Sequence, residues 1–288
     1  MFERLLAPLF VLLWSTGFIG AKYGLPYADA LHFLSARYAF VVLLMGAAAL
    51  MFRAPWPRSA DRVLHVAVAG VLMQAVYLGG VFLAIGRGLP AALTSLIVGL
   101  QPLITALMAG LLLGERVSRQ QWTGLALGFA GVLLVVSDSR HPGLGQSWGV
   151  TALWPALMAL AGITAGTLYQ KRFCPVFDLR SGAVIQFAAS FLVTAPLAMA
   201  LEPRPIEWTP TFMFALAWLV LLLSLGAISL LNVLIRRGSA VKVTSLFYLT
   251  PGVTALCAWL LFDERLGPFA VLGMVVGALG VWLARARA

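Results

Sequence analysis

Long apolar segments follow one another along almost the whole chain, and short loops that hold most of the charged residues separate them. A helix needs about 20 mostly apolar residues to cross the hydrocarbon core of a bilayer. Cutting the chain at these loops predicts ten membrane-crossing helices, at 5–24, 31–52, 63–86, 89–113, 120–137, 148–170, 181–201, 212–235, 240–262 and 268–284. The pattern therefore predicts an all-α integral membrane protein with ten transmembrane helices.

Composition agrees with this pattern. The chain of 288 residues is 61% hydrophobic and 10% charged, whereas a soluble domain has about 25% charged residues. So little polar surface cannot cover a water-soluble protein, and we expect the lipid bilayer to surround it. The net charge of +10 comes from basic residues in the loops, so we expect no nucleic-acid binding.

The basic residues also predict an orientation. With ten helices, 14 of the 20 lysines and arginines fall on the side that holds both chain ends, and 6 fall on the other side. Short loops rich in lysine and arginine stay in the cytoplasm. We therefore expect a multi-pass protein of the inner (plasma) membrane with both termini cytoplasmic.

Two stretches of the sequence are closely similar. "TSLIVGLQPLITALMAGLLLGER" begins at Thr94, and "TSLFYLTPGVTALCAWLLFDER" begins at Thr244. A shift of 149 residues places Pro102 on Pro251, and further glycines align in the helices that follow. We therefore predict two five-helix repeats, residues 1–137 and 148–288. Because five is odd, the repeats are inverted about a pseudo-two-fold axis in the membrane plane, as is typical of secondary transporters. A duplicated membrane enzyme or scaffold is the alternative.

The paired ends "LLLGER" and "LLFDER", the glycine-rich helices after them and the opening "FVLLWSTGFIGAKYGLP" give a family resemblance. The whole chain resembles the drug/metabolite transporter (DMT) superfamily, its EamA-type members in particular. The resemblance implies export of amino acids and related metabolites without a bound cofactor.

Six polar or aromatic side chains are predicted to contact substrate. Trp14 is expected at mid-membrane, which is too deep for an interfacial tryptophan. Gln74 and Tyr77 are three residues apart and therefore lie on one face of their helix. The six candidates are Trp14, Gln74, Tyr77, Gln101, Tyr248 and Thr250. For Gln74 and Tyr77, tying helices together is the alternative role.

Six further positions are predicted to break or gate helices. Pro102 and Pro251 each remove a backbone donor near the middle of a crossing, so they either line a cavity wall or serve packing. Glu115, Arg116, Glu264 and Arg265 are expected to fix the helical hairpins, with gating as the alternative.

All ten acidic residues fall in loops or at helix ends, away from the mid-membrane positions of proton relays. Lys22 and Arg37 are expected near the extracellular helix ends as snorkelling anchors, or as groups that draw carboxylates into a vestibule. A neutral or zwitterionic solute is therefore expected. No catalytic cluster or metal-ligand motif stands out, so the chain is not expected to be an enzyme or to bind a metal or cofactor.

The sequence thus predicts an inner-membrane secondary transporter that exports amino acids or similar small metabolites by alternating access. The alternative is efflux of drugs or other metabolites by the same fold, with or without proton coupling. A monomer and a homodimer both remain open.

Overall fold

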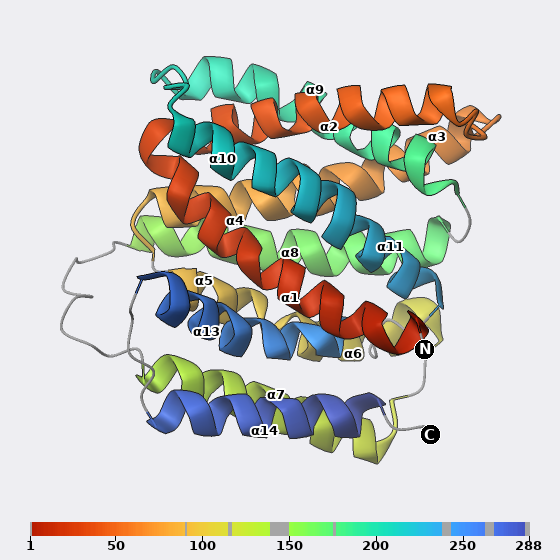
Figure 1. The fold of residues 1–288 in the computed structure, drawn as a ribbon. Coiled ribbons are helices and arrows are strands. Elements are labelled where there is room, and N and C mark those ends of the chain that lie inside the picture. Colours follow the sequence, from red (N-terminus) through yellow and green to blue (C-terminus); the bar gives the residue numbers. More distant parts are fainter. Residues whose placement is uncertain are drawn as a thin grey trace.

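The structure is a computed structural model, which describes residues 2–89, 91–114, 117–138, 150–174, 177–237, 243–262 and 268–285. All regular elements in these ranges are helical (Figure 1). The first half contains α1 (Phe2–Gly24), η1 (Leu25–Tyr27), α2 (Ala30–Met51), α3 (Ala60–Gly70), η2 (Val71–Val76), α4 (Tyr77–Gly86), α5 (Ala91–Val98), α6 (Gln101–Leu113) and α7 (Arg119–Asp138). The second half contains α8 (Val150–Phe173), α9 (Leu179–Leu201), α10 (Pro210–Trp218), η4 (Leu219–Ala227), α11 (Ile228–Arg237), η5 (Ser245–Leu249), α13 (Thr250–Phe262) and α14 (Pro268–Arg285).

Within the described residues, six segments are long and apolar enough to cross a membrane. They are Leu6–Tyr27, Ala30–Met51, Ala60–Gly86, Thr151–Phe173, Leu179–Leu201 and Pro210–Arg236. The protein is therefore an all-helical membrane protein with several crossing helices. The count of ten stays a prediction.

Two of these crossing segments contain a π-helical stretch in the middle. In the first, η2 joins α3 to α4, and in the second, η4 joins α10 to α11. Shifting η2 by 149 residues places it inside η4. A π-helical stretch widens the helix and often marks a functional region.

The two similar stretches that begin at Thr94 and Thr244 do not lie in continuous α-helices. The sequence predicts one helix at 89–113 and one at 240–262. α5 ends at Val98 and α6 begins at Gln101, directly before Pro102. In the second half, the 3-10 helix η5 ends at Leu249, and α13 begins just before Pro251. Proline lacks a backbone donor, so Pro102 and Pro251 cannot bond to the carbonyls of Val98 and Phe247 four residues earlier, which explains both interruptions.

α7 and α14 pack side by side through glycines at one edge of the bundle (Figure 1). A Cβ atom added to Gly131 would lie 2.5 Å from the backbone nitrogen of Gly277. One added to Gly280 would lie 2.4 Å from that of Gly128. The two backbones therefore approach as closely as glycine-lined membrane helices allow.

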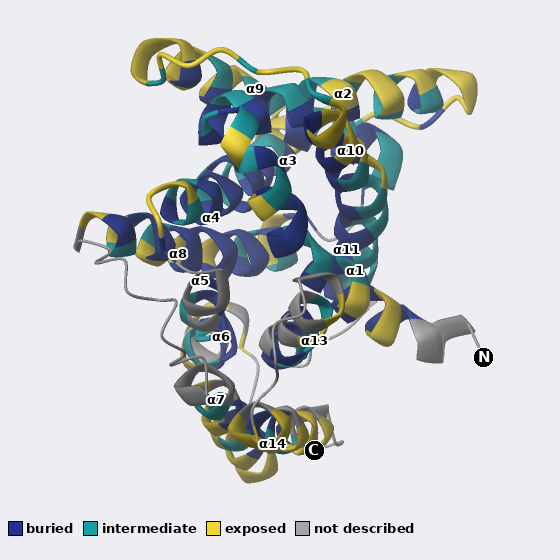
Figure 2. Cartoon of the chain, turned by 60° about the vertical axis from the view of Figure 1, so that its left-hand side comes forward, coloured by how far each residue is buried: buried dark blue, intermediate teal, exposed yellow. Residues whose placement is uncertain are grey.

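α1, α10, η4 and α11 form one wall in the middle of the bundle, and α3, η2, α4 and α8 form the facing wall. Figure 2 shows buried residues where the walls face each other and exposed residues on outward surfaces such as those of α2, α9 and α14. The first residue of α1 and the last of α14 lie at the same end of the bundle (Figure 1), which we call the termini end.

Candidate functional site

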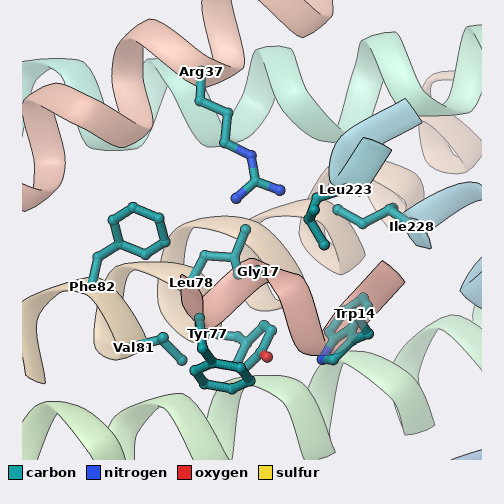
Figure 3. Close-up of a pocket in the computed structure, with 10 residues that line it drawn as sticks. Trp14, Gly17, Arg37, Tyr77, Leu78, Val81, Phe82, Leu223 and Ile228 are labelled. Atoms are coloured by element: carbon teal, nitrogen blue, oxygen red, sulfur yellow. The ribbon is translucent and has the colours of Figure 1, made fainter. Parts of the chain in front are cut away.

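A narrow cavity of about 30 Å³ lies between the two walls (Figure 3). It is lined mostly by apolar and aromatic side chains from α1, α2, α4, η4 and α11: Trp14, Gly17, Phe18, Arg37, Tyr77, Leu78, Val81, Phe82, Leu223 and Ile228. Binding pockets for drug-sized ligands measure about 300–1,000 Å³, and one water needs about 10–15 Å³ by a comparable measure. In this conformation the cavity therefore has room for a few waters, and the walls must separate to admit a metabolite.

The position of Arg37 corrects an expectation from the sequence. Its side chain is 2% exposed and points into the cavity (Figure 3). Seven residues, about 10 Å of helix, separate it from Ala30 at the start of α2. Arg37 is therefore not a snorkelling anchor but the charged group of the cavity.

Ser224 holds this guanidinium in place. Arg37 Nε donates a 2.8 Å hydrogen bond to Ser224 Oγ, and both side chains are buried. Ser224 belongs to the π-helical segment η4, so the bond joins α2 to the widened part of the wall formed by α1, α10, η4 and α11. Within the described part of the chain, no acidic side chain forms an ion pair with Arg37.

Trp14 and Tyr77, both sequence-predicted contacts, meet in the cavity. Their rings stack nearly parallel, with centroids 6.0 Å apart and planes 7° apart. Phe10 and Phe247 hold the other sides of the Trp14 ring, at centroid distances of 5.1 and 5.2 Å. The aromatic surface is therefore fixed by packing from α1, α4 and η5.

Two other predicted contacts, Gln74 and Gln101, are buried without lining this cavity. The backbone oxygen of Gln74 accepts a 2.8 Å hydrogen bond from the hydroxyl of Tyr38. Gln101 Nε2 donates to Thr167 Oγ1 of α8 at 3.2 Å. In both residues the side-chain oxygen is buried and has no partner among the described residues.

Tyr248 and Thr250 also lie outside the cavity lining. The Tyr248 ring packs against Gly128 of α7, where an added Cβ would lie 2.2 Å from the ring. The backbone oxygen of Thr250 accepts a 3.4 Å hydrogen bond from Ser15 of α1. Pro102 is buried at the start of α6. The side chain of Pro251 and the residues Glu115, Arg116, Glu264 and Arg265 lie outside the described residues.

Toward the termini end, a chain of buried amides joins α8, α9 and α11. Gln170 Nε2 donates to Asn232 Oδ1 at 2.9 Å, and Gln186 Nε2 donates to Gln170 Oε1 at 3.0 Å. Next to them, Lys171 Nζ donates to the backbone oxygen of Ile235 at 2.9 Å. This amide cluster was not predicted from the sequence, although three amides inside apolar segments were a visible signal.

Among the described residues, no group of three or more His, Cys, Asp or Glu side chains could hold a metal ion. The chemistry that the cavity offers is one oriented guanidinium, a stacked aromatic pair and an apolar lining. Such a site can bind and orient a small molecule.

Comparison with known proteins identifies the family. The model of the EamA-like transporter family matches the chain twice, at residues 1–137 and 150–286. A probable amino-acid metabolite efflux pump of Escherichia coli K12 is 25% identical over 98% of this chain and 94% of its own length. An uncharacterized inner membrane transporter of the same strain is 26% identical over 96% of this chain and 90% of its own length.

A solved crystal structure has the same fold. It superposes with a TM-score of 0.78 at 18% sequence identity and covers 97% of this chain and 95% of its own. The family match spans nearly the whole sequence, and the chain belongs to the EamA-like transporter family.

Proposed function

We propose that the protein is an inner-membrane secondary transporter that exports amino acids or similar small metabolites by alternating access. The observation that carries the proposal is the cavity between the two walls, in which Arg37, Trp14 and Tyr77 face a mostly apolar lining. The name of the Escherichia coli relative, an amino-acid metabolite efflux pump, supports the same substrate range.

The transport cycle uses two inverted five-helix repeats, residues 1–137 and 148–288, and ten crossing helices. Three observations support this architecture. The family model matches the chain twice, the π-helical segments η2 and η4 stand 149 residues apart, and Gly131 and Gly280, also 149 apart, make matching contacts between α7 and α14. Two similar halves expose one central site to either side at similar energy.

We infer that the amide cluster Gln170–Asn232–Gln186, which joins α8, α9 and α11, closes the path toward the termini end in this conformation. The sequence predicts that this end is cytoplasmic. Export then requires the α8–α11 contact to open for loading and the facing walls to part at the opposite end for release. The helix interruptions before Pro102 and Pro251 supply bend points for these movements.

Within this cycle Arg37, Trp14 and Tyr77 contact the substrate directly. Gln74, Gln101, Tyr248 and Thr250 each keep a buried oxygen without a partner among the described residues. Such groups are costly to leave unsatisfied, so we assign them to the path that opens in other conformations. The hairpin pairs Glu115–Arg116 and Glu264–Arg265 keep their expected role of fixing the hairpins.

Efflux of drugs or other apolar metabolites is a second candidate, because most of the cavity lining is apolar. Comparing transport of amino acids and small carboxylates with transport of apolar drugs separates the two candidates.

The test is transport by purified protein in proteoliposomes, with radiolabelled amino acids and small carboxylates and with or without an imposed pH gradient. We expect saturable transport of at least one of these solutes, reduced in Trp14→Ala. The exposed Trp208, which is 55% exposed, gives a control in Trp208→Ala. Absence of transport for the whole panel, with transport of apolar drugs instead, would reject the proposal in favour of the second candidate.

A further inference from the structure

The positive charge of Arg37 in the cavity has no counter-ion among the described residues. Arg37 is 2% exposed, and its one hydrogen bond within the described part of the chain uses Nε, which donates to Ser224. Figure 3 shows the end of the guanidinium directed into the space between Leu78 and Leu223. A buried cation is unfavourable unless an anion pairs with it, and the described acidic residues lie elsewhere. Among the described residues no acidic group pairs with it, which leaves this role to an anion that enters the cavity.

The geometry of arginine narrows the kind of anion. A guanidinium presents its donors as a planar fork that matches the two oxygens of a carboxylate. The bond from Nε to Ser224 fixes the orientation of this plane, and the terminal nitrogens face the cavity. An oriented fork with two donors on one side favours a carboxylate over a spherical anion.

The other residues that line the cavity indicate what the rest of the ligand is like. Trp14 and Tyr77 give a flat aromatic surface, and Val81, Phe82 and Ile228 give an aliphatic and aromatic rim. These side chains accept an aromatic or branched apolar group, which gains free energy by leaving water. Among the described lining residues no carboxylate is present to hold an ammonium group. A zwitterion would therefore bury its ammonium without a counter-ion, which is unfavourable.

The other half of the chain supports a special role for Arg37. A shift of 149 residues places Arg37 on Gln186, and Gln186 is a neutral amide in the amide cluster. The two halves thus have a buried polar side chain at the same position, but only the one beside the cavity is charged. At this position of the second half the neutral Gln186 fills a structural role, so the positive charge of Arg37 needs another explanation.

We propose that the preferred substrate is a small carboxylate monoanion with an aromatic or branched apolar body, and that Arg37 binds its carboxylate. This inference rests on the proposed function and narrows its substrate class: within amino-acid-like metabolites it selects those without a free ammonium group. It replaces the sequence-based expectation of a neutral or zwitterionic solute.

The test compares three probes that share one body and differ in charge. They are 3-phenylpropionate (monoanion), L-phenylalanine (zwitterion) and 3-phenylpropan-1-ol (neutral), bound as radioligands to the full chain in nanodiscs. We expect 3-phenylpropionate to bind about tenfold or more tightly than the other two, as charge-assisted hydrogen bonds predict. Equal affinity for L-phenylalanine or for the alcohol would overturn the inference.

Variants then assign the preference to Arg37. Arg37→Gln places the side chain of the equivalent position 186 there, and we expect it to bind all three probes equally weakly. Arg37→Lys keeps the charge without the fork, and Ser224→Ala frees the guanidinium, so both should lose part of the preference. Arg87→Gln removes a cation that lies outside the cavity and donates to Thr151 at 3.2 Å, and we expect no change. If Arg37→Gln does not fold, Arg37→Lys and Ser224→Ala decide, and an unchanged preference in both overturns the inference.

Transport by the same preparations separates this inference from the proposed function. Selective binding of 3-phenylpropionate without transport of any probe would support the carboxylate site and contradict the transporter proposal. Transport of L-phenylalanine with unchanged rates in Arg37→Gln would support the transporter proposal and overturn the carboxylate site.

Discussion

The indole of Trp14 and the phenol ring of Tyr77 lie 6.0 Å apart, centroid to centroid, in planes only 7° apart. Trp14 comes from α1 and Tyr77 from α4, so this stack bridges the two walls that face the cavity. Tyr77 is the first residue after the π-helical segment η2. The widened helix therefore ends where the aromatic surface of the cavity begins.

Replacing Trp14 tests whether this surface binds substrate. Trp14→Ala removes the larger ring of the stack, whereas Trp14→Phe keeps an aromatic face. Aromatic pairs contribute about 0.5–1.5 kcal/mol beyond their buried area, so we expect KM for an aromatic carboxylate to rise roughly 3- to 10-fold in Trp14→Ala and less in Trp14→Phe. Transport kinetics in proteoliposomes measure both variants. An unchanged KM in Trp14→Ala would show that the stack serves only packing.

Much of the fold follows from the sequence, because apolar length and loop charges indicate where helices begin and end. The close contact of α7 with α14 also has its signal in glycines repeated after 149 residues. The interruptions before Pro102 and Pro251 lie beside prolines that the sequence marks as breaks, but the pattern of apolar residues continues through them. Apolar length therefore predicted single helices where the structure has two segments.

The candidate site was harder to predict. Trp14 and Tyr77 carry their own signal, since large rings with one polar group are unusual at mid-membrane. Arg37 carries no such signal, because an arginine seven residues into a helix can either snorkel to the membrane surface or point into the protein. The choice depends on Ser224, which is 187 residues away in sequence. A single sequence does not show such a long-range pair, and the same holds for Gln170 with Asn232.

The glycine contact between α7 and α14 should tolerate no side chain. In Gly280→Ala the new Cβ would lie 2.4 Å from the backbone nitrogen of Gly128, which cannot move away without shifting α7. Overpacking of this kind costs about 1–3 kcal/mol, so we expect a lower Tm in thermal unfolding of the purified protein. Gly46→Ala in α2 is the control, because no atom lies within 4 Å of its added Cβ. Equal Tm values for the two variants would contradict this packing.

Stability at low pH should depend on Asp178, which precedes α9. Its carboxylate accepts hydrogen bonds from Arg180 Nε at 3.1 Å and Nη2 at 2.9 Å, and this bonding lowers the pKa of Asp178 below its usual value. A lowered pKa stabilises the folded state above the unfolded pKa of about 4, and this contribution is lost as the pH falls through the folded pKa. The effect is small because the pair is partly exposed.

We therefore expect Asp178→Asn to unfold at a slightly lower temperature than the wild type at neutral pH, with the difference shrinking below about pH 4. Thermal unfolding at a series of pH values measures it. Arg180→Gln should lower the unfolding temperature with the same dependence on pH, because it removes the partner that lowers the pKa of Asp178. A constant difference between Asp178→Asn and wild type across the series would contradict the pairing.

The amide cluster at the termini end should control which side of the protein is open. Asn232→Leu keeps the size of the side chain and removes the acceptor of the 2.9 Å bond from Gln170. One such hydrogen bond contributes about 0.5–1.5 kcal/mol, enough to shift the balance of conformers by roughly 2- to 10-fold. Lys171 lies beside the cluster, with Nζ bonded to the backbone of Ile235, so acetylation of Lys171, followed by peptide mass spectrometry, reports the opening.

We expect Lys171 to react several-fold faster in Asn232→Leu than in the wild type. Ser190→Ala is a matched control, because Ser190 is also buried in this part of the bundle but bonds only along its own helix, to the backbone of Gln186 at 2.8 Å. Its loss should leave the reaction rate unchanged, since it joins no two helices. If Lys171 reacts at the same rate in Asn232→Leu as in the wild type, the cluster fixes the packing of α8 and α11 without acting as a gate. Alternating access would then need its closure at the termini end from another contact.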